Sequence, residues 1–169
     1  MLFRSGKNID FKFFQKEGFS IGSKIKNQGW KFYCLLKENT YIDLVRKFYL
    51  NLSYYNGIVK SLMKGVNIVL DPLHLGQILH LPCEGYTHME LSIKEEGLSA
   101  ILGRVFTENL NKLEVKILSV EMRLLHHMVT KLFVPRSARY DLLSGRNICI
   151  MYHVITQTPL NLQIGRAHV

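Results

Sequence analysis

Cysteine is scarce in this 169-residue sequence, which contains only Cys34, Cys83 and Cys149. Small secreted domains that are stabilised by disulfides carry an even number of cysteines, and zinc sites use short spacings between Cys or His ligands. The sequence shows neither arrangement, which argues against both classes. We expect the three side chains to be buried free thiols.

Long apolar runs are lacking as well. No stretch approaches the roughly 18 consecutive apolar residues that a membrane-spanning helix needs. The N-terminus carries Arg4 and Lys7 where a secretory signal would be apolar. We therefore expect no membrane partner, and a location in the cytoplasm or the nucleus.

Acidic residues are few, because 13 Asp and Glu stand against 22 Lys and Arg, which gives a formal net charge of +9. The excess lies almost wholly in residues 1–65, whose net charge is +8, whereas residues 66–169 contribute +1. Lys and Arg attract phosphate groups, and exposed aromatic rings stack on unpaired bases. The basic half therefore predicts RNA or DNA as a partner.

Seven basic residues are the candidate nucleic-acid contacts: Lys24, Lys26, Lys31, Arg46, Lys47, Lys60 and Lys64. Aromatic residues are interleaved with lysines in the first part of the basic half: Phe11, Phe13, Phe14, Phe19, Trp30, Phe32 and Tyr33. Two interpretations of these rings stay open. They either stack on bases, or they fill a hydrophobic core while the lysines remain solvated.

The remaining composition, with 47% hydrophobic residues, is that of one globular domain of ordinary size. Residues 1–28 alternate glycine, lysine and phenylalanine without periodicity, so we expect a poorly defined, basic and aromatic N-terminal segment that is irregular or forms short helices. We expect residues 29–163 to form a single helical domain. The predicted fold class is mainly α (α+β), with one small β-hairpin near residues 58–70.

The clearest helical pattern begins at Thr40. Apolar residues recur at helical spacing over residues 41–52, and Thr40 with Asp43 resembles a capping box. The pair Asn56-Gly57 tolerates left-handed geometry, so we expect it to end this helix. Two short runs rich in β-branched residues follow on either side of Lys64-Gly65, and they predict the hairpin.

The later part of the chain predicts further helices. Asp71-Pro72 combines a capping carboxylate with the preset backbone of proline, and predicts a helix that ends at Leu81-Pro82. Residues 83–103 predict a connection with one short helix. An amphipathic helix is predicted over residues 113–132, before Pro135, and a last helix over residues 148–155.

Three carboxylates have a spacing reminiscent of a catalytic triad. Some enzymes use three carboxylates to hold two metal ions, and Asp10, Asp71 and Glu108 are the candidates by position. We give this little weight, because Asp71 is already expected to cap a helix and a motif counts only in its structural context.

The histidines offer no better site. His74, His80 and Cys83 lack the fourth ligand of a zinc site. Because His126 and His127 are adjacent on a predicted helix, they point about 100° apart, and we expect His127 at the core boundary. The sequence thus predicts no catalytic residue, no metal site, no cofactor and no small-molecule substrate.

Several segments occur in an order that is similar to a known family. They are Gly29-Trp30 with Phe32; residues 44–52; Lys64-Gly65-Val66; Asp71-Pro72 with residues 78–82; residues 132–135; and residues 148–155 with Asn161. Through these segments, residues 18–162 resemble the putative plant transposon protein domain, found in open reading frames of plant retroelements and related to their gag-like first reading frames. The chain departs from that pattern after Arg123, where residues 124–127 stand in place of an expected tryptophan.

The resemblance implies a plant source and a transposable-element origin. It further implies a non-enzymatic, gag-like protein fragment that associates with nucleic acid or with itself through its basic half. Two alternatives stay open. One is an accessory DNA-processing protein, associated with a transposase or integrase, whose catalytic part lies outside this chain; the other is a relic open reading frame without function.

The last six residues, 164–169, read IGRAHV, which matches one reading frame of a widely used sequencing adapter. We expect these residues to be an adapter-derived scar. On that expectation the domain is truncated at its C-terminus, and the natural chain continues past Gln163.

Overall fold

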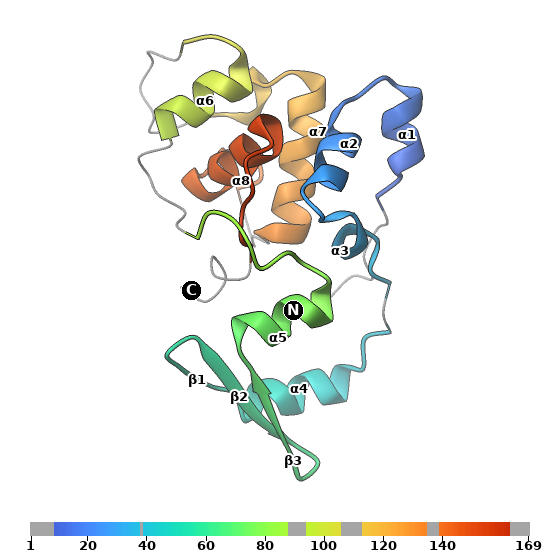
Figure 1. Ribbon diagram of the computed structural model, residues 1–169, viewed down its shortest axis with the longest axis vertical. Coiled ribbons are helices and arrows are strands. Elements are labelled where there is room, and N and C mark those ends of the chain that lie inside the picture. The colour runs from blue at the N-terminus through green and yellow to red at the C-terminus, as the bar shows by residue number, and fades with distance from the viewer. Residues whose placement is uncertain (1–8, 38, 88–93, 106–112, 135–138, 163–169) are drawn as a thin grey trace.

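The computed structural model describes residues 9–37, 39–87, 94–105, 113–134 and 139–162. Within these residues the chain is mainly helical and has one three-stranded antiparallel sheet. The sheet and helix α4 (Ile42–Leu50) lie at one end of the molecule, and most other helices gather at the opposite end (Figure 1). The predicted fold class is confirmed.

The helical end, which we call the helical body, combines helices from both halves of the chain. Its helices are α1 (Phe11–Lys16), α2 (Ile21–Asn27), α3 (Lys31–Leu35), α6 (Lys94–Leu102), α7 (Val120–Met128) and α8 (Gly145–Thr156), with the π-helical turn η4 (Val129–Phe133). Residues 11–27, for which the sequence predicts irregular structure or short helices, thus form α1 and α2. The domain boundaries stay a prediction.

Helix α8 lies at the centre of the hydrophobic core. It packs against α2, α6, α7 and η4, and its buried side chains include Ile148, Ile150 and Met151. A helix that is apolar on most of its circumference is stable only when other elements cover it. The core of the body is therefore organised around α8.

Trp30 is fully buried beside this centre. Its ring centroid lies 5.1 Å from that of Phe133, on which the ring of Tyr33 stacks at 5.4 Å. The hydroxyl of Tyr33 donates a hydrogen bond of 2.9 Å to the carbonyl of Leu132. This aromatic cluster joins α3 to η4, which are about 100 residues apart in the sequence.

Polar side chains set the first residue of several helices. Asp10 accepts hydrogen bonds from two backbone amides at the start of α1, and the hydroxyls of Ser119 and Ser144 each accept one at the start of α7 and α8. Helix α5 (Pro72–Leu79) begins as the sequence predicts, because the Asp71 carboxylate accepts the amide of His74 at 2.7 Å. Each cap satisfies a backbone donor that the helix itself leaves unpaired.

The predicted capping box and the predicted end of α4 are wrong. Tyr41 is the N-cap of α4 and makes no side-chain cap, and the helix ends at Leu50. Asn56-Gly57 instead forms a two-residue turn, with φ of 46° and 79°, between strands β1 (Ser53–Tyr55) and β2 (Ile58–Met63). A pair that favours positive φ suits such a hairpin turn as well as a helix end, and pairing with β2 decides the outcome.

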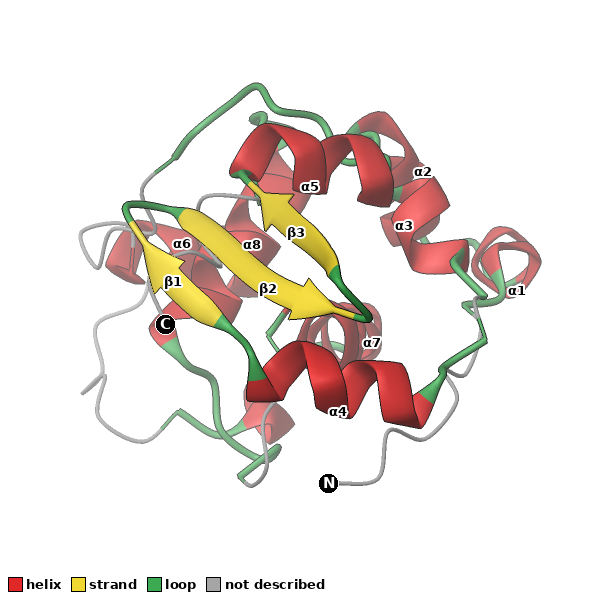
Figure 2. Ribbon diagram, turned by 90° about the horizontal axis from the view of Figure 1, so that it is seen from below, coloured by secondary structure: helices red, strands yellow, loops and turns green. Residues whose placement is uncertain are grey.

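The predicted hairpin near residues 58–70 is confirmed, with β1 as an additional strand. Strand β2 pairs antiparallel with β3 (Val66–Leu70), in a register that places Ser61 opposite Ile68. Lys64 and Gly65, with φ of 49° and 81°, make the second two-residue turn. The strand order is β1, β2, β3, and Figure 2 shows the three strands side by side.

Helix α5 connects β3 to the helical body. Its last turn is closed by His80, whose φ is 51° and whose ring centroid lies 4.0 Å from that of Phe32 in α3. Nearby, a Cβ on Gly29 would lie 2.8 Å from the Cγ of Pro82, and Gly29 itself has a φ of 75°. Only glycine meets both conditions, so Gly29 is needed where the chain after α5 passes α3.

The helix predicted over residues 113–132 begins later in the structure than the sequence indicates. Val115–Ile117 form a 3-10 turn, η3, and Ser119 caps a new helix, α7, which continues through η4. The Ser119 hydroxyl accepts a hydrogen bond from the amide of Met122, and this cap starts the helix at Val120. The apolar periodicity before Ser119 does not extend the helix towards the N-terminus. Pro135, the predicted stop, lies outside the described residues. The last helix is confirmed and runs from Gly145 to Thr156.

A polar cluster fixes the segment that follows α8. The side-chain amide of Gln28 donates to the carbonyls of His153 and Thr158, at 2.7 and 2.9 Å. The Nδ1 of His153 lies 2.7 Å from the hydroxyl oxygen of Thr158. His153 is 3% exposed, and its pKa is lowered because burial disfavours the charged imidazolium, an effect that the hydrogen bond to the backbone carbonyl of Thr158 opposes.

Replacing Trp30 with alanine is expected to lower the free energy of unfolding by about 3–5 kcal/mol, because it leaves a cavity in the core. The variant Trp30→Phe should lose less than half as much free energy of unfolding as Trp30→Ala. It keeps a ring against Phe133, and it removes the buried indole N–H, which has no hydrogen-bond partner among the described residues. Urea unfolding followed by circular dichroism measures both. Equal stability of Trp30→Ala and the wild type would contradict this account of the core.

Burial of His153 predicts a stability that depends on pH. The unfolded pKa is near the ordinary value of about 6.5 and the folded pKa is lower, so this contribution is complete above about pH 6.5. It is lost as the pH falls from there towards the folded pKa. We expect the urea midpoint of the wild type to fall between pH 7.5 and 5, and that fall to be smaller in His153→Asn. The control variant is His127→Asn, which removes an exposed histidine. Its urea midpoint should fall with pH as that of the wild type does.

Candidate nucleic-acid interface

The seven basic residues singled out from the sequence fall into two groups. Lys24 and Lys26 lie in α2, and Lys31 begins α3, so this group belongs to the helical body. The others belong to what we call the α4–sheet unit, residues 40–70: Arg46 and Lys47 in α4, Lys60 in β2, and Lys64 in the second turn. All are exposed except Lys24, which is half-buried.

Most of these charges have no acidic partner. The Nη1 of Arg46 lies 3.9 Å from the Oδ1 of Asp43, in a pair that is open to solvent. Within the part of the chain that the structure describes, the six lysines of the set form no ion pair. Their charges therefore remain available to an anionic partner.

Most aromatic residues of the N-terminal segment contribute to the hydrophobic core and not to a surface for base stacking. Trp30 is 0% and Phe14 6% exposed, and Phe11, Phe19 and Tyr33 are half-buried. Buried rings cannot stack on bases, so the predicted stacking surface over residues 11–33 is not formed as a set. Phe13 and Phe32 remain exposed.

Exposed aromatic rings occur instead in the α4–sheet unit, whose tyrosines the sequence did not single out for stacking. They are Tyr41, Tyr49, Tyr54 and Tyr55, which are 64%, 61%, 47% and 77% exposed. A signal was present: half of the eight tyrosines fall within residues 41–55, close to four basic residues. The helical spacing of Tyr41 and Tyr49 favoured a buried role, and only the tertiary structure shows that these rings are exposed.

The sheet has two faces with different neighbours. Helix α4 packs on β2, where the hydroxyl of Ser61 donates to the carbonyl of Phe48 at 2.8 Å. Side chains alternate along a strand, so residues directly opposite one another share a face. The register places Ser53, Lys60 and Val69 together on the other face, which we call the outer face. Tyr55, Ile58, Leu62 and Asn67 belong to it too.

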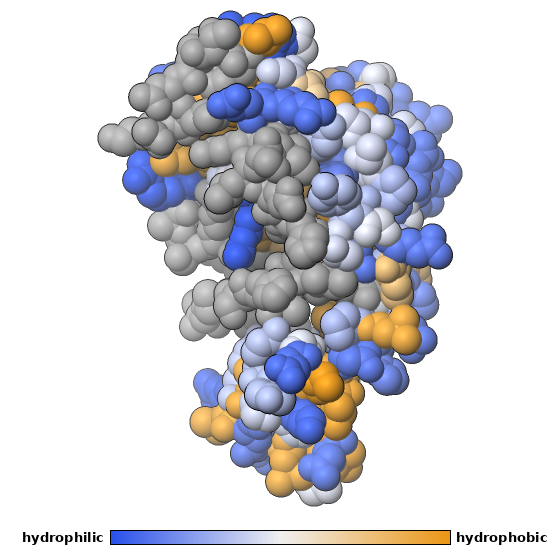
Figure 3. Space-filling view, turned by 60° about the vertical axis from the view of Figure 1, so that its left-hand side comes forward, coloured by the Kyte–Doolittle hydropathy of each residue, from blue (hydrophilic) through white to orange (hydrophobic). Residues whose placement is uncertain are grey.

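The outer face is hollowed. A hollow of about 370 Å³ is lined by Asn51, Ser53, Lys60, Leu62, Asn67 and Val69, together with parts of Ser61 and Ile68. Figure 3 shows hydrophobic and hydrophilic residues side by side at this end of the molecule. The hollow therefore combines apolar walls with polar groups and one positive charge.

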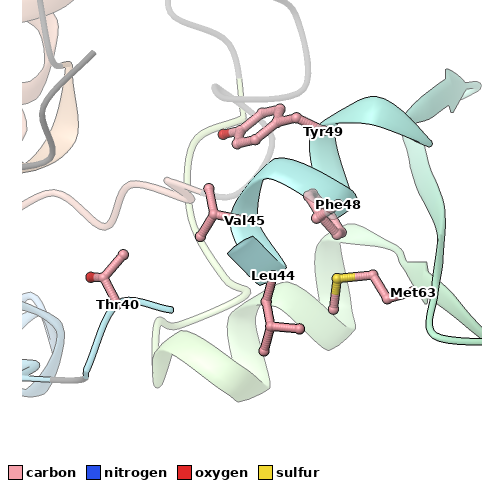
Figure 4. A pocket seen from close by; sticks show the side chains of 6 residues that line it. All are labelled: Thr40, Leu44, Val45, Phe48, Tyr49 and Met63. Atoms are coloured by element: carbon pink, nitrogen blue, oxygen red, sulfur yellow. The ribbon is translucent and has the colours of Figure 1, made fainter. Parts of the chain in front are cut away.

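A second hollow, which we call the α4 hollow, lies between α4 and β2. It measures about 420 Å³, and its lining is apolar except for the Thr40 and Tyr49 hydroxyls. Figure 4 shows Leu44 and Phe48 of α4 beside Met63 of β2, with Val45 and Tyr49 on the neighbouring side of the helix. Its lining carries no charged side chain, which distinguishes it from the outer face.

The carboxylates considered as a catalytic set have structural roles. Asp10 caps α1, and Asp71 caps α5 while its second oxygen lies 2.8 Å from the Nδ1 of His74. Backbone hydrogen bonding from His74 is the main reason that the pKa of Asp71 is lowered. Glu108 lies outside the described residues. Across the described ranges, no group of three or more His, Cys, Asp or Glu could hold a metal ion.

The cysteines and histidines sort by burial. Cys34 and Cys149 are buried free thiols as predicted, and burial raises the pKa of Cys34 to about 12 and that of Cys149 to about 11. Cys83 is exposed in the loop after α5, so the prediction of a buried thiol is wrong for that residue. His126 is buried and His127 exposed, although the latter was expected at the core boundary.

None of the helices in the described ranges has both the length and the apolar character needed to cross a membrane. A protein-family model described as "Putative plant retrotransposon-related domain" matches residues 26–166. No curated protein and no solved structure matches the chain. The match spans the α4–sheet unit and every described helix after α2.

Proposed function

The chain belongs to the putative plant retrotransposon-related domain family, and from that membership we propose that it is a gag-like, non-enzymatic module that binds nucleic acid. Its origin in a plant transposable element follows from the family itself. The proposal places its activity in the cytoplasm or the nucleus, where the RNA and DNA of such an element are found. It needs no membrane and no small-molecule substrate.

One observation carries the proposal. The six lysines of the candidate set are exposed or half-buried, and they form no ion pair within the described residues. Phosphate contacts by lysine release condensed counterions, and this release supplies most of the affinity of sequence-independent binding. A chain with a net charge of +9, concentrated in one half, is suited to that mode of binding.

The non-enzymatic part of the proposal is supported by the carboxylates. Both oxygens of Asp71 are engaged by His74, and Asp10 is engaged by the first turn of α1. A carboxylate that holds a helix start is poorly placed to hold a catalytic metal ion as well. An accessory role in DNA processing would then depend on a catalytic part elsewhere.

Self-association is a second candidate, favoured by the α4 hollow. Tyr49 in its lining is 61% exposed, and Ile42 and Leu50 of the same helix are 64% and 82% exposed. Exposed apolar side chains beside an apolar hollow are typical of an interaction site. The charged pair at its rim, Asp43 with Arg46, is nearly neutral. Two copies could therefore pack through this surface without strong repulsion.

Reversal of five basic residues tests nucleic-acid binding. The variant replaces Lys24, Lys26, Lys31, Arg46 and Lys47 with glutamate. We expect it to weaken binding of a labelled single-stranded RNA, measured by fluorescence anisotropy. The slope of log affinity against log salt should flatten by roughly 0.7 for each phosphate group that the variant no longer neutralises.

A control with the same change of charge is available in the other half. It replaces five exposed basic residues: Lys116, Arg123, Lys131, Arg139 and Arg146. Circular dichroism confirms that both variants are folded. If the control loses as much affinity as the test variant, net charge alone explains binding and the assigned surface is wrong.

Substitution of Val45, which lines the α4 hollow, tests self-association. If two copies pack through this surface, Val45→Glu should convert dimers to monomers, because a buried, unpaired carboxylate strongly disfavours the contact. Light scattering coupled to size exclusion measures the mass, and Val120→Glu is the control at an exposed valine of α7. A wild type that stays monomeric at high concentration would refute this candidate.

A further inference from the structure

The outer face of the sheet differs from the usual solvent face of a small antiparallel sheet. Such faces are normally polar, because only the covered face needs apolar side chains. Here Tyr55, Leu62 and Val69 are 77%, 48% and 53% exposed on the outer face. These apolar groups lie uncovered in a strongly basic part of the chain.

Lys60 stands at the middle of this face. It lies opposite Ser53 on one neighbouring strand and opposite Val69 on the other. Tyr55 is two residues from Ser53 on the same face, so its Cα lies about 7 Å along β1 from that of Ser53. A flat aromatic ring and a positive charge are therefore presented together.

The hollow beside Lys60 has the chemical character that a nucleobase requires. Leu62 and Val69 supply apolar walls for the faces of a base, and the Asn67 amide, together with the side-chain oxygens of Asn51 and Ser53, supplies hydrogen-bonding groups for its edges. Binding pockets for small planar groups commonly combine an apolar lining with a few polar groups. At about 370 Å³ the hollow has room for a single base.

The charge around the hollow selects an anion. No outer-face residue is acidic, and the single acid of residues 40–70, Asp43, already pairs with Arg46. Lys47 adds a second positive charge near the rim, because it lies one helical turn from Asn51 and on the same side of α4. The Asn51 amide donates both to the carbonyl of Lys47, at 3.1 Å, and to that of Leu62 in β2, at 2.9 Å.

We propose that the outer face of the β1–β2–β3 sheet binds single-stranded nucleic acid, with one base in the hollow, a neighbouring base stacked on Tyr55, and phosphates at Lys60 and Lys47. This inference rests on the proposed function and adds the site and the strandedness of the ligand. Base faces are accessible to an aromatic ring only when they are unpaired and unstacked. A duplex can reach the lysines but not the ring or the hollow.

The test compares a labelled 12-nucleotide uridine-rich RNA with the same RNA in a duplex, using fluorescence anisotropy at two salt concentrations. We expect the single strand to bind more tightly to the wild-type chain. Tyr55→Ala should weaken single-strand binding about tenfold, the effect of losing one stacked base, and leave duplex binding unchanged. Tyr55→Phe keeps the ring and should bind as the wild type does.

Two further variants locate the site. Tyr41→Ala removes a ring that is 64% exposed at the start of α4, outside the outer face, and should leave single-strand affinity unchanged. Lys60→Gln should weaken binding and reduce the salt slope by roughly the amount expected for one phosphate. Thermal unfolding shows whether each variant keeps the fold; because Tyr55 is exposed, we expect Tyr55→Ala to do so.

The outcomes separate this inference from the proposed function. Binding of neither RNA form would refute the proposed function and this inference with it. Equal affinity for both forms, with Tyr55→Ala matching the wild type, would refute only the inference. An effect of Tyr41→Ala as large as that of Tyr55→Ala would place the bases elsewhere, and loss of a dimer in Tyr55→Ala with RNA affinity retained would show that a second copy covers this face.

Discussion

Burial of α8 is the constraint on which the rest of the structure depends. This helix exposes almost no apolar surface, because α2 from the N-terminal part, α6 from the middle, and α7 with η4 all pack on it. Each partner is short and has too few apolar residues to be stable alone. Their mutual burial therefore stabilises all of them, and the Trp30 cluster extends the same core to α3.

The α4–sheet unit is stabilised differently. Within residues 40–70 the buried side chain is that of Ser61, a polar residue whose hydrogen bond to Phe48 joins β2 to α4. Two tight turns with positive φ and the Asn51 hydrogen bonds supply the remaining order. Because no apolar residue of this unit is fully buried, its tyrosines are exposed and its aliphatic residues are exposed or half-buried. On the outer face such residues lie beside Lys60, which forms no ion pair within the described residues, whereas the lining of the α4 hollow carries no charged side chain.

Local signals in the sequence predicted local structure well. Asp71-Pro72 begins α5, Lys64-Gly65 turns the hairpin, and the apolar run near residue 150 forms a buried helix, as expected. The failures occurred where one signal suits two structures. Asn56-Gly57 favours positive φ in a hairpin turn as well as at a helix end, and the periodicity before Ser119 continued past a residue that caps a new helix.

The sequence by itself determined the excess of positive charge, its concentration in one half, and the residue types that begin helices and turns, because these depend only on composition and near neighbours. The order of several short segments along the sequence also indicated the family to which the chain belongs. Tertiary structure decided which aromatic rings are exposed on the surface, where a partner can reach them. Trp30 and Phe14 are buried because other helices pack on them, whereas Tyr55 is 77% exposed because none of the described helices covers the outer face. Burial depends on contacts between distant segments, and such contacts are not encoded in the spacing of neighbouring residues.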